Sequence, residues 1–165
     1  MATSEEEYGS NYKAHLLEQY KLYVEMADRL SSRRQSANSF FLSVNTAIIA
    51  LVGYLNFGSK ASSEFYWLVS LSGIVLCFMW YRLIRSYKDL NSAKFKVIHE
   101  IEAQLPLAPY DMEWDKVGRG KNSRLYLPFT RVEVLIPWVF LVLHVFVFLK
   151  AVSFLSFLAQ ELAAK

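Results

Sequence analysis

The sequence has few of the residues that break helices or cross-link chains, with one cysteine, four prolines and six glycines among 165 residues. The single cysteine, Cys77, has no second cysteine in the chain to pair with, and a lone thiol in an apolar stretch is more typical of a buried side chain than of a metal ligand. Neither glycine nor proline occurs from Asn11 to Val52. Because these two residues interrupt helices most strongly, this stretch is predicted to form one unbroken helix.

Recognisable catalytic and metal-binding motifs are also missing. His99-Glu100 lacks the second histidine of a zinc-protease motif, and the three histidines have no ligand-like spacing. Gly-Arg-Gly-Lys at 118–121 lacks the strand and helix of a phosphate loop and is typical of a tight turn. The sequence therefore predicts no enzymatic activity, cofactor or metal. The following carboxylates are predicted to form a solvated helix and loop face: Glu100, Glu102, Asp111, Glu113 and Asp115.

Long apolar stretches are what the sequence has in abundance. Hydrophobic residues make up 54% of the chain, against about 45–50% in soluble domains. Three runs, at 40–57, 65–84 and 134–158, each reach the ~17–25 residues that a helix needs to cross a ~30 Å hydrocarbon core. A long, mostly polar segment precedes the first run, so we expect no cleavable signal sequence and expect the first span to serve as the insertion signal.

Basic residues are concentrated in two segments. Five of them precede the first span and nine lie between the second and third, whereas the connection 58–64 holds only Lys60 and the C-terminal tail only Lys165. Because Lys and Arg next to membrane spans tend to stay in the cytoplasm, the N-terminus is predicted to be cytoplasmic and the C-terminus external. A basic face beside a membrane attracts anionic lipid headgroups, so the net charge of +3 does not indicate a nucleic-acid partner.

Helical stripes extend beyond the first two spans. In the N-terminal segment, apolar residues recur at spacings of four, three, four and three, which is typical of a helix packed against another helix. These residues are Leu16, Tyr20, Tyr23, Ala27 and Leu30. A second stripe follows the second span and comprises Leu83, Tyr87, Leu90, Val97, Ile101 and Leu105. The two stripes can bury each other within one chain or pair between subunits. Pro106 and Pro109 are predicted to end the second arm, and 110–131 to pack back onto it.

These patterns predict an all-α membrane protein with three transmembrane helices, the first two extended into a cytoplasmic helical hairpin stalk. The expected order is an N-terminal cytoplasmic amphipathic helix (1–38), a first span (39–57), an external loop (58–64), a second span (65–84), a cytoplasmic helix with a proline- and aromatic-rich connector (85–131), a third span (132–158) and an external tail (159–165). The short connection between the first two spans favours an antiparallel hairpin.

Polar residues within the spans form the first candidate site, because such groups usually face a protein interior or a wet cavity. They are Asn45, Thr46, His144 and Lys150. For Asn45, a hydrogen bond that fixes helix packing is favoured over ion conduction. For His144, a satisfied interhelical histidine is favoured over a pH sensor or proton relay. Lys150 either lines a pathway or marks the end of the span and reaches the headgroups, and the second interpretation is favoured.

A second candidate set consists of basic residues that an anionic ligand or lipid headgroup would contact. Its members are Arg33, Arg34, Arg85, Lys88, Arg119 and Lys121. In the second span, Ser70, Ser72 and Gly73 permit close approach of another helix. Together with the stalk stripes, these small residues are compatible with a cyclic homo-oligomer, whose axis would be a candidate pore.

Three stretches resemble the RipA-type family of small bacterial membrane proteins, which are described as octameric: Tyr20–Ile48, Trp80–Trp114 and Tyr126–Phe140. The clearest signals are Arg33-Arg34-Gln35 and the block from Trp80 to Trp114. The resemblance implies a multi-pass protein of the bacterial inner membrane, a homo-octamer, and a role in stress or host adaptation for the founding members. It transfers no functional residue.

Three functional hypotheses follow. The first is a non-enzymatic homo-oligomeric inner-membrane protein, a channel or a scaffold with a cytoplasmic stalk, in a stress response. The second is a membrane effector of a bacterial defence or signalling system, gated by a cytoplasmic nucleotide or protein partner that the basic residues would contact. The third is a scaffold whose basic residues contact only membrane lipids.

Overall fold

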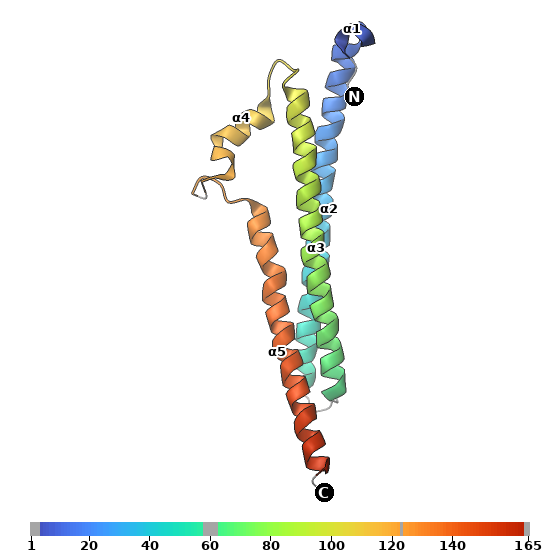
Figure 1. Ribbon diagram of the computed structural model, residues 1–165, viewed down its shortest axis with the longest axis vertical. Coiled ribbons are helices and arrows are strands. Elements are labelled where there is room, and N and C mark those ends of the chain that lie inside the picture. The colour runs from blue at the N-terminus through green and yellow to red at the C-terminus, as the bar shows by residue number, and fades with distance from the viewer. Residues whose placement is uncertain (1–3, 58–62, 123, 164–165) are drawn as a thin grey trace. The chain divides into compact units, whose positions relative to one another are not determined.

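The computed structural model describes residues 4–57, 63–122 and 124–163. The elements in this part of the chain are all helical: α1 (Glu5–Tyr8), α2 (Tyr12–Phe57), α3 (Ser63–Glu102), α4 (Pro109–Lys116), the 3-10 turn η1 (Gly118–Gly120) and α5 (Phe129–Ala163) (Figure 1). Helices α2, α3 and α5 are each long and apolar enough to cross a membrane, which confirms the predicted fold class. The expected external loop lies largely outside the described residues, as does the end of the tail at 164–165.

The chain divides into two compact units, which are described separately. The arm unit consists of Met1–Arg34 and Ser86–Phe129, and the membrane unit of Gln35–Arg85 and Thr130–Lys165. Helices α2 and α3 contribute to both units without a break, so each is a single helix of 46 or 40 residues. The absence of glycine and proline from Asn11 to Val52 predicted the continuity of α2.

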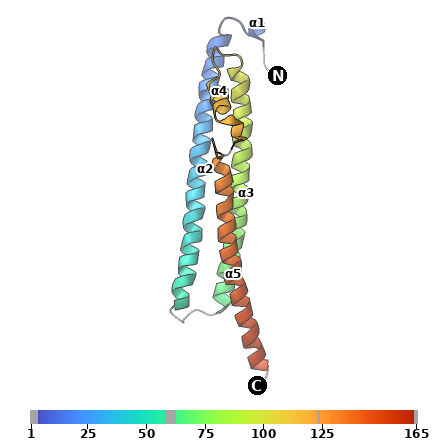
Figure 2. The same cartoon turned by 90° about the vertical axis from the view of Figure 1, so that its left-hand side faces the viewer.

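In the arm unit, α2 and α3 lie side by side (Figures 1 and 2). Ala27 and Leu30 of α2 are buried, as the first stripe predicts, and so are Ile98 and Ile101 of α3. Leu90 belongs to the second predicted stripe, yet half of it is exposed, so the prediction is wrong at this position. The buried face of the arm unit is therefore built from the N-terminal half of α2 and the last turns of α3.

Helix α3 ends at Glu102, three residues before the predicted end of the arm. The amides of Gln104 and Leu105 bond to carbonyls three residues back, at 3.0 Å each. The α-helical hydrogen-bond pattern therefore changes to the tighter 3-10 pattern, and the helix ends before Pro106. The start of the connector then forms α4, which the sequence analysis did not predict. Its first residue is proline, a favourable choice in a first helical turn because the missing N–H has no partner there.

The connector packs back as predicted. Tyr110 of α4 meets Phe95 of α3 edge to face, with ring centroids 5.6 Å apart. Segment 118–120 is a tight turn in which Gly118, Arg119 and Gly120 have φ values of 68°, 49° and 68°. A Cβ at position 120 would lie 3.1 Å from the Trp114 ring, so glycine suits both the backbone and the available space there.

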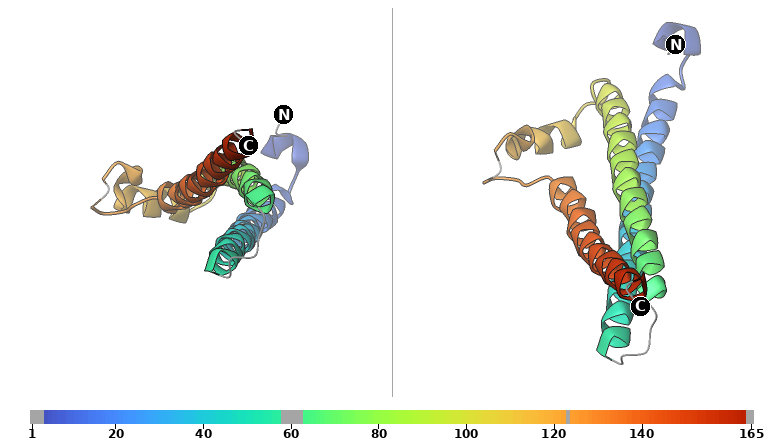
Figure 3. Two further views of the ribbon diagram at one scale, coloured as in Figure 1. Left: turned by 90° about the horizontal axis from the view of Figure 1, so that it is seen from below. Right: turned by 60° about the horizontal axis from the view of Figure 1, so that its bottom comes forward.

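In the membrane unit, α2, α3 and α5 pack together, with α3 antiparallel to the other two (Figures 2 and 3). One face of α3 is buried at spacings of three and four, through Ser70, Gly73, Cys77, Trp80 and Ile84. The Trp80 ring stacks on Phe41 of α2 at 5.8 Å and lies 6.2 Å from the Phe140 ring of α5. This face of α3 contacts both neighbouring helices.

Candidate functional site

One side chain from each membrane helix joins in a buried polar cluster, here called the Asn45 link. Asn45 of α2 accepts hydrogen bonds through Oδ1 from Cys77 of α3, with Sγ at 3.3 Å, and from His144 of α5, with Nε2 at 3.0 Å. Asn45 and His144 are each 0% exposed, and Cys77 is 2% exposed. The structure thus brings together Asn45 and His144, the two predicted candidates for interhelical hydrogen bonding.

The hydrogen-bond pattern assigns both the amide orientation and the histidine tautomer. The Nδ2 of Asn45 donates to the Phe41 carbonyl at 2.8 Å, because the opposite orientation would place two oxygens against each other. Oδ1 therefore faces His144, whose Nε2 must carry the proton. Nδ1 of His144 is then a lone-pair acceptor, and it has no hydrogen-bond partner among the described residues. It is sealed from solvent within a single subunit.

Gly73 makes room for this histidine. A Cβ built at position 73 would overlap three atoms of the His144 ring, so the imidazole rests directly on the backbone of α3. A glycine inside a helix costs roughly 0.5–1 kcal/mol relative to alanine, and here it permits the close helix contact. The sequence predicted that small residues of the second span permit close approach of another helix. At Gly73 that helix is α5 of the same chain, through His144.

A second polar cluster, the Asn38 link, also joins all three helices. Trp80 of α3 donates from Nε1 to Oδ1 of Asn38 on α2 at 2.9 Å, and Nδ2 of Asn38 donates to Oε1 of Glu133 on α5 at 2.8 Å. Because the indole nitrogen only donates, this pattern also fixes the amide orientation. Glu133 is 4% exposed, so its carboxylate is buried against these partners.

The two links follow the helix directions. Going from the Asn38 link to the Asn45 link, residue numbers increase on α2 and α5. On α3 they decrease, from Trp80 to Cys77. This is the order that two parallel helices and one antiparallel helix require. Each link uses one group from every membrane helix, so each is complete only when all three helices are packed together. Their arrangement supports a role in fixing how the helices pack.

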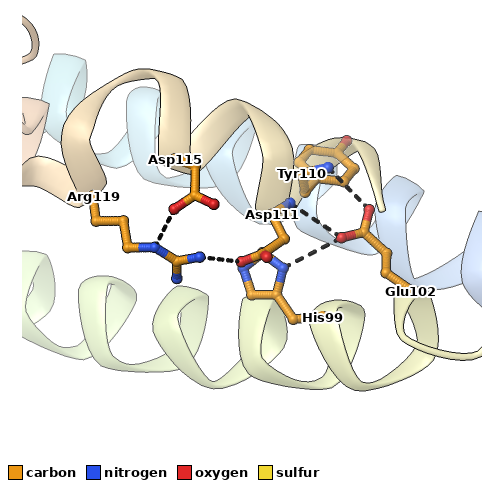
Figure 4. Close-up of polar contacts among 6 residues, drawn as sticks. All are labelled: His99, Glu102, Tyr110, Asp111, Asp115 and Arg119. Carbon is orange, nitrogen blue, oxygen red and sulfur yellow. Dashed lines mark hydrogen bonds and ion pairs between the residues drawn. The ribbon is translucent and has the colours of Figure 1, made fainter. Parts of the chain in front are cut away.

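In the arm unit, Glu102 is the centre of a third polar cluster (Figure 4). Its Oε1 accepts from the Tyr20 hydroxyl at 2.9 Å and from the Tyr110 amide at 3.0 Å, while Oε2 accepts from the Asp111 amide at 3.2 Å and lies 3.3 Å from Nδ1 of His99. Glu102 is 1% exposed. The prediction that it belongs to a solvated acidic face is therefore wrong, because four donors compensate for its burial.

The Glu102 carboxylate also caps α4. Ala108, at the N-cap position, provides no side-chain hydrogen bond, so Glu102 supplies the acceptor that the first amides of the helix need. Burial alone would raise the pKa of Glu102, but the bonds from the Tyr110 amide, Tyr20, His99 and the Asp111 amide together lower it. The same burial, with the bond to Glu102, raises the pKa of Tyr20 to about 12. The pair is thus a neutral phenol donating to a carboxylate.

Comparison with known protein families assigns the chain to one of them. The model of the Octameric membrane protein family (8xMP) matches residues 17–153, a range that contains all three polar clusters. The chain belongs to this family. No curated protein and no solved structure matches it. Membership of the octameric membrane protein family and the three candidate spans agree with the expectation of a multi-pass, self-associating membrane protein.

In this member of the octameric membrane protein family, the other predicted intramembrane residues do not join the links. Thr46 follows Asn45 directly but is exposed on the surface of α2. Lys150 is exposed on α5, with Nζ 5.7 Å from the Phe146 ring centroid. Both side chains are exposed whereas Asn45 and His144 are buried, so the four predicted residues do not form one buried site.

The predicted basic residues are divided between the two units. Arg33, Arg85 and Lys88 are exposed, and Arg85 belongs to the membrane unit whereas the others belong to the arm unit. Arg119 is bound within α4 and its turn: it bonds to Asp115 and, at 3.0 Å, to Asp111 (Figure 4). Lys121 is exposed, and Arg34 is half-buried. Among the described residues, no group of three metal-ligating side chains is found.

The sequence analysis missed Asn38, Glu133 and the role of Gly73. Asn38 and Glu133 stand at the edges of the apolar runs, where polar residues normally face water or headgroups. Spacing carried a usable signal: Asn38 lies seven residues before Asn45 and Glu133 eleven before His144, about two and three helical turns, so each pair shares a helix face.

Proposed function

We propose that this protein is a non-enzymatic scaffold that assembles as a homo-octamer in the bacterial inner membrane, with the arm unit in the cytoplasm. One observation carries the proposal: Asn45 and His144 are enclosed within a single subunit and bonded to each other. Polar groups that line a water path must face that path. These two instead hold three helices of one subunit together, which leaves the outer helix faces for lipid and neighbouring subunits.

Ion flux across vesicles tests the scaffold against the channel. We expect reconstituted wild-type protein and the Asn45→Leu/His144→Leu variant to give the same flux as protein-free vesicles, because neither residue contacts a conducting path. Octamer mass, measured by native mass spectrometry on the same samples, confirms that assembled protein is present. Flux through the wild type that the double substitution reduces would support a channel and overturn the scaffold.

The proposed orientation rests on the concentration of basic residues on the arm side of the spans. We expect alkaline phosphatase fused after Lys165 to be active and green fluorescent protein fused at the same place to be dark, because that end lies outside the cytoplasm. A fluorescent protein fused before Met1 should be bright. The reverse pattern would place the arm unit outside the cytoplasm.

The gated-effector alternative requires the basic residues to meet one anion. Arg119 is already paired with Asp111 and Asp115. It is therefore not free to bind a nucleotide together with the other basic residues. This favours the scaffold, in which the arm unit offers a folded surface and binds no small ligand.

A further inference from the structure

The arm unit carries an acidic groove between α2 and α4. It has a volume of about 550 Å³, and its lining residues are Tyr20, Lys21, Val24, Glu25 and Asp28 of α2 and Pro109, Tyr110 and Glu113 of α4. Its charged groups are Lys21, Glu25, Asp28 and Glu113. Two aromatic hydroxyls, from Tyr20 and Tyr110, complete the polar part of the lining.

Two of these carboxylates have no cationic partner among the described residues. Lys21 bonds to Glu18 at 2.8 Å and Glu25 to Arg29 at 2.7 Å. Asp28 and Glu113, by contrast, make no side-chain hydrogen bond or ion pair with any described residue. Burial, followed by the charges of Asp28, Glu113 and Glu102, raises the pKa of Tyr110. The groove is thus a region of negative potential.

Positively charged residues lie at the C-terminal end of α4 and just after it, at positions 116–122 and 124, which are here called the basic turn. Lys116, Lys121 and Arg124 are exposed, and none forms an ion pair with a carboxylate among the described residues. Arg119 bonds back to Asp111 and Asp115. The left-handed backbone at 118–120 and this internal bond hold the turn while the other three cations remain on its surface.

We propose that the basic turn of one subunit docks in the acidic groove of the next, as a head-to-tail contact between arm units. A closed ring whose subunits are related by rotation needs two different, complementary patches on every chain. The groove and the turn are such a pair, and both belong to the arm unit. Charge complementarity identifies a second copy of the chain as the occupant. The contact rests on the homo-oligomeric part of the proposed function and is independent of the scaffold role.

Disulfide cross-linking of the full-length protein in nanodiscs tests the contact. Asp28→Cys and Arg124→Cys are combined with Cys77→Ser, which removes the native thiol and keeps a hydrogen-bond donor for Asn45. Oxidation should give a ladder of covalent multimers on a non-reducing gel. Each single-cysteine variant should run as a monomer on the same gel. A head-to-tail contact never brings two copies of position 28, or of position 124, together.

Charge reversal gives the second readout. In the double-cysteine background, Lys121→Glu or Glu113→Lys alone should lower the cross-linking yield at least about fivefold, since either places like charges together. The two reversals combined should restore the yield. Lys96→Glu, an exposed cation on α3, is the matched control and should change little. Yields unaffected by reversal, or cross-linking in a single-cysteine variant, would overturn the proposal.

Octamer mass separates failure of this contact from failure of the assembly. An intact octamer without a ladder refutes the docking and leaves the homo-oligomer standing, whereas loss of the octamer itself refutes that part of the proposed function. If Lys121 and Arg124 are instead protected from amine- and guanidine-directed labelling only in nanodiscs with anionic lipid, headgroups occupy the turn and the proposed contact is wrong.

Discussion

Replacing Gly73 by alanine is expected to destabilise the membrane unit by about 2–4 kcal/mol, the sum of an overpacked helix contact and a lost interhelical hydrogen bond. The added methyl group would overlap the His144 ring. The ring lies against the α3 backbone, so either His144 leaves Asn45 or α3 and α5 separate. Unfolding of the detergent-solubilised protein, followed by tryptophan fluorescence, measures the change.

Two further variants show whether this cost comes from the histidine. Gly53 lies in α2, where an added Cβ meets nothing within 4 Å in its own subunit, so Gly53→Ala should be neutral or slightly stabilising. In a His144→Ala background, Gly73→Ala should cost much less than in the wild type, because the overlapping ring is gone. An equal cost in both backgrounds would contradict the assigned contact.

Replacing Glu102 by alanine is expected to release α4 from α3 and to cost about 2–4 kcal/mol, because a buried charged acceptor serves several donors. The Tyr20 hydroxyl and the amides of Tyr110 and Asp111 would lose their acceptor. Hydrogen exchange at residues 110–111 should accelerate strongly. Glu100→Ala removes an exposed carboxylate two residues away on α3 and should leave this exchange unchanged. Equal effects of the two substitutions would refute the capping role.

The same carboxylate predicts a dependence on pH. The pKa of Glu102 is lower in the folded protein than its usual value, so its contribution to stability is present above that value, about 4.3. It is lost as the pH falls through the lowered folded pKa. Wild-type arm-unit stability should therefore decline below about pH 4 more steeply than that of Glu102→Gln, which has no charge to lose. Parallel acid unfolding of the two proteins would contradict this.

Much of the fold could be predicted because the signals are local. Apolar length defines three spanning helices, and the lack of glycine and proline predicts the continuity of α2. Helix α4 was missed because it is only eight residues long and has no buried residue of its own. Its start depends on Glu102, whose carboxylate reaches across from another helix, so no local pattern in the connector reveals it.

The candidate site was only partly predictable for a related reason. A polar residue within a span signals an interior position, which identified Asn45 and His144. Which residues meet depends on how three helices are rotated against one another, and a single sequence does not specify this. Asn38 and Glu133 were missed since the ends of a span are ordinary places for polar side chains. Gly73 appeared as a small residue, but the ring that it accommodates comes from a helix 71 residues later in the chain.

The order of the helices along the chain sets the order in which the bonds of the two links can form. Helices α2 and α3 leave the ribosome first, and the bonds from Trp80 to Asn38 and from Cys77 to Asn45 can form within that hairpin alone. Helix α5 brings Glu133 and His144, the members of the two links that are most costly to expose to lipid. When it enters the membrane, the amide NH₂ of Asn38 and the amide oxygen of Asn45 are already in place to receive them. The α2–α3 hairpin thus offers one hydrogen-bonding group for each of the two polar side chains of α5.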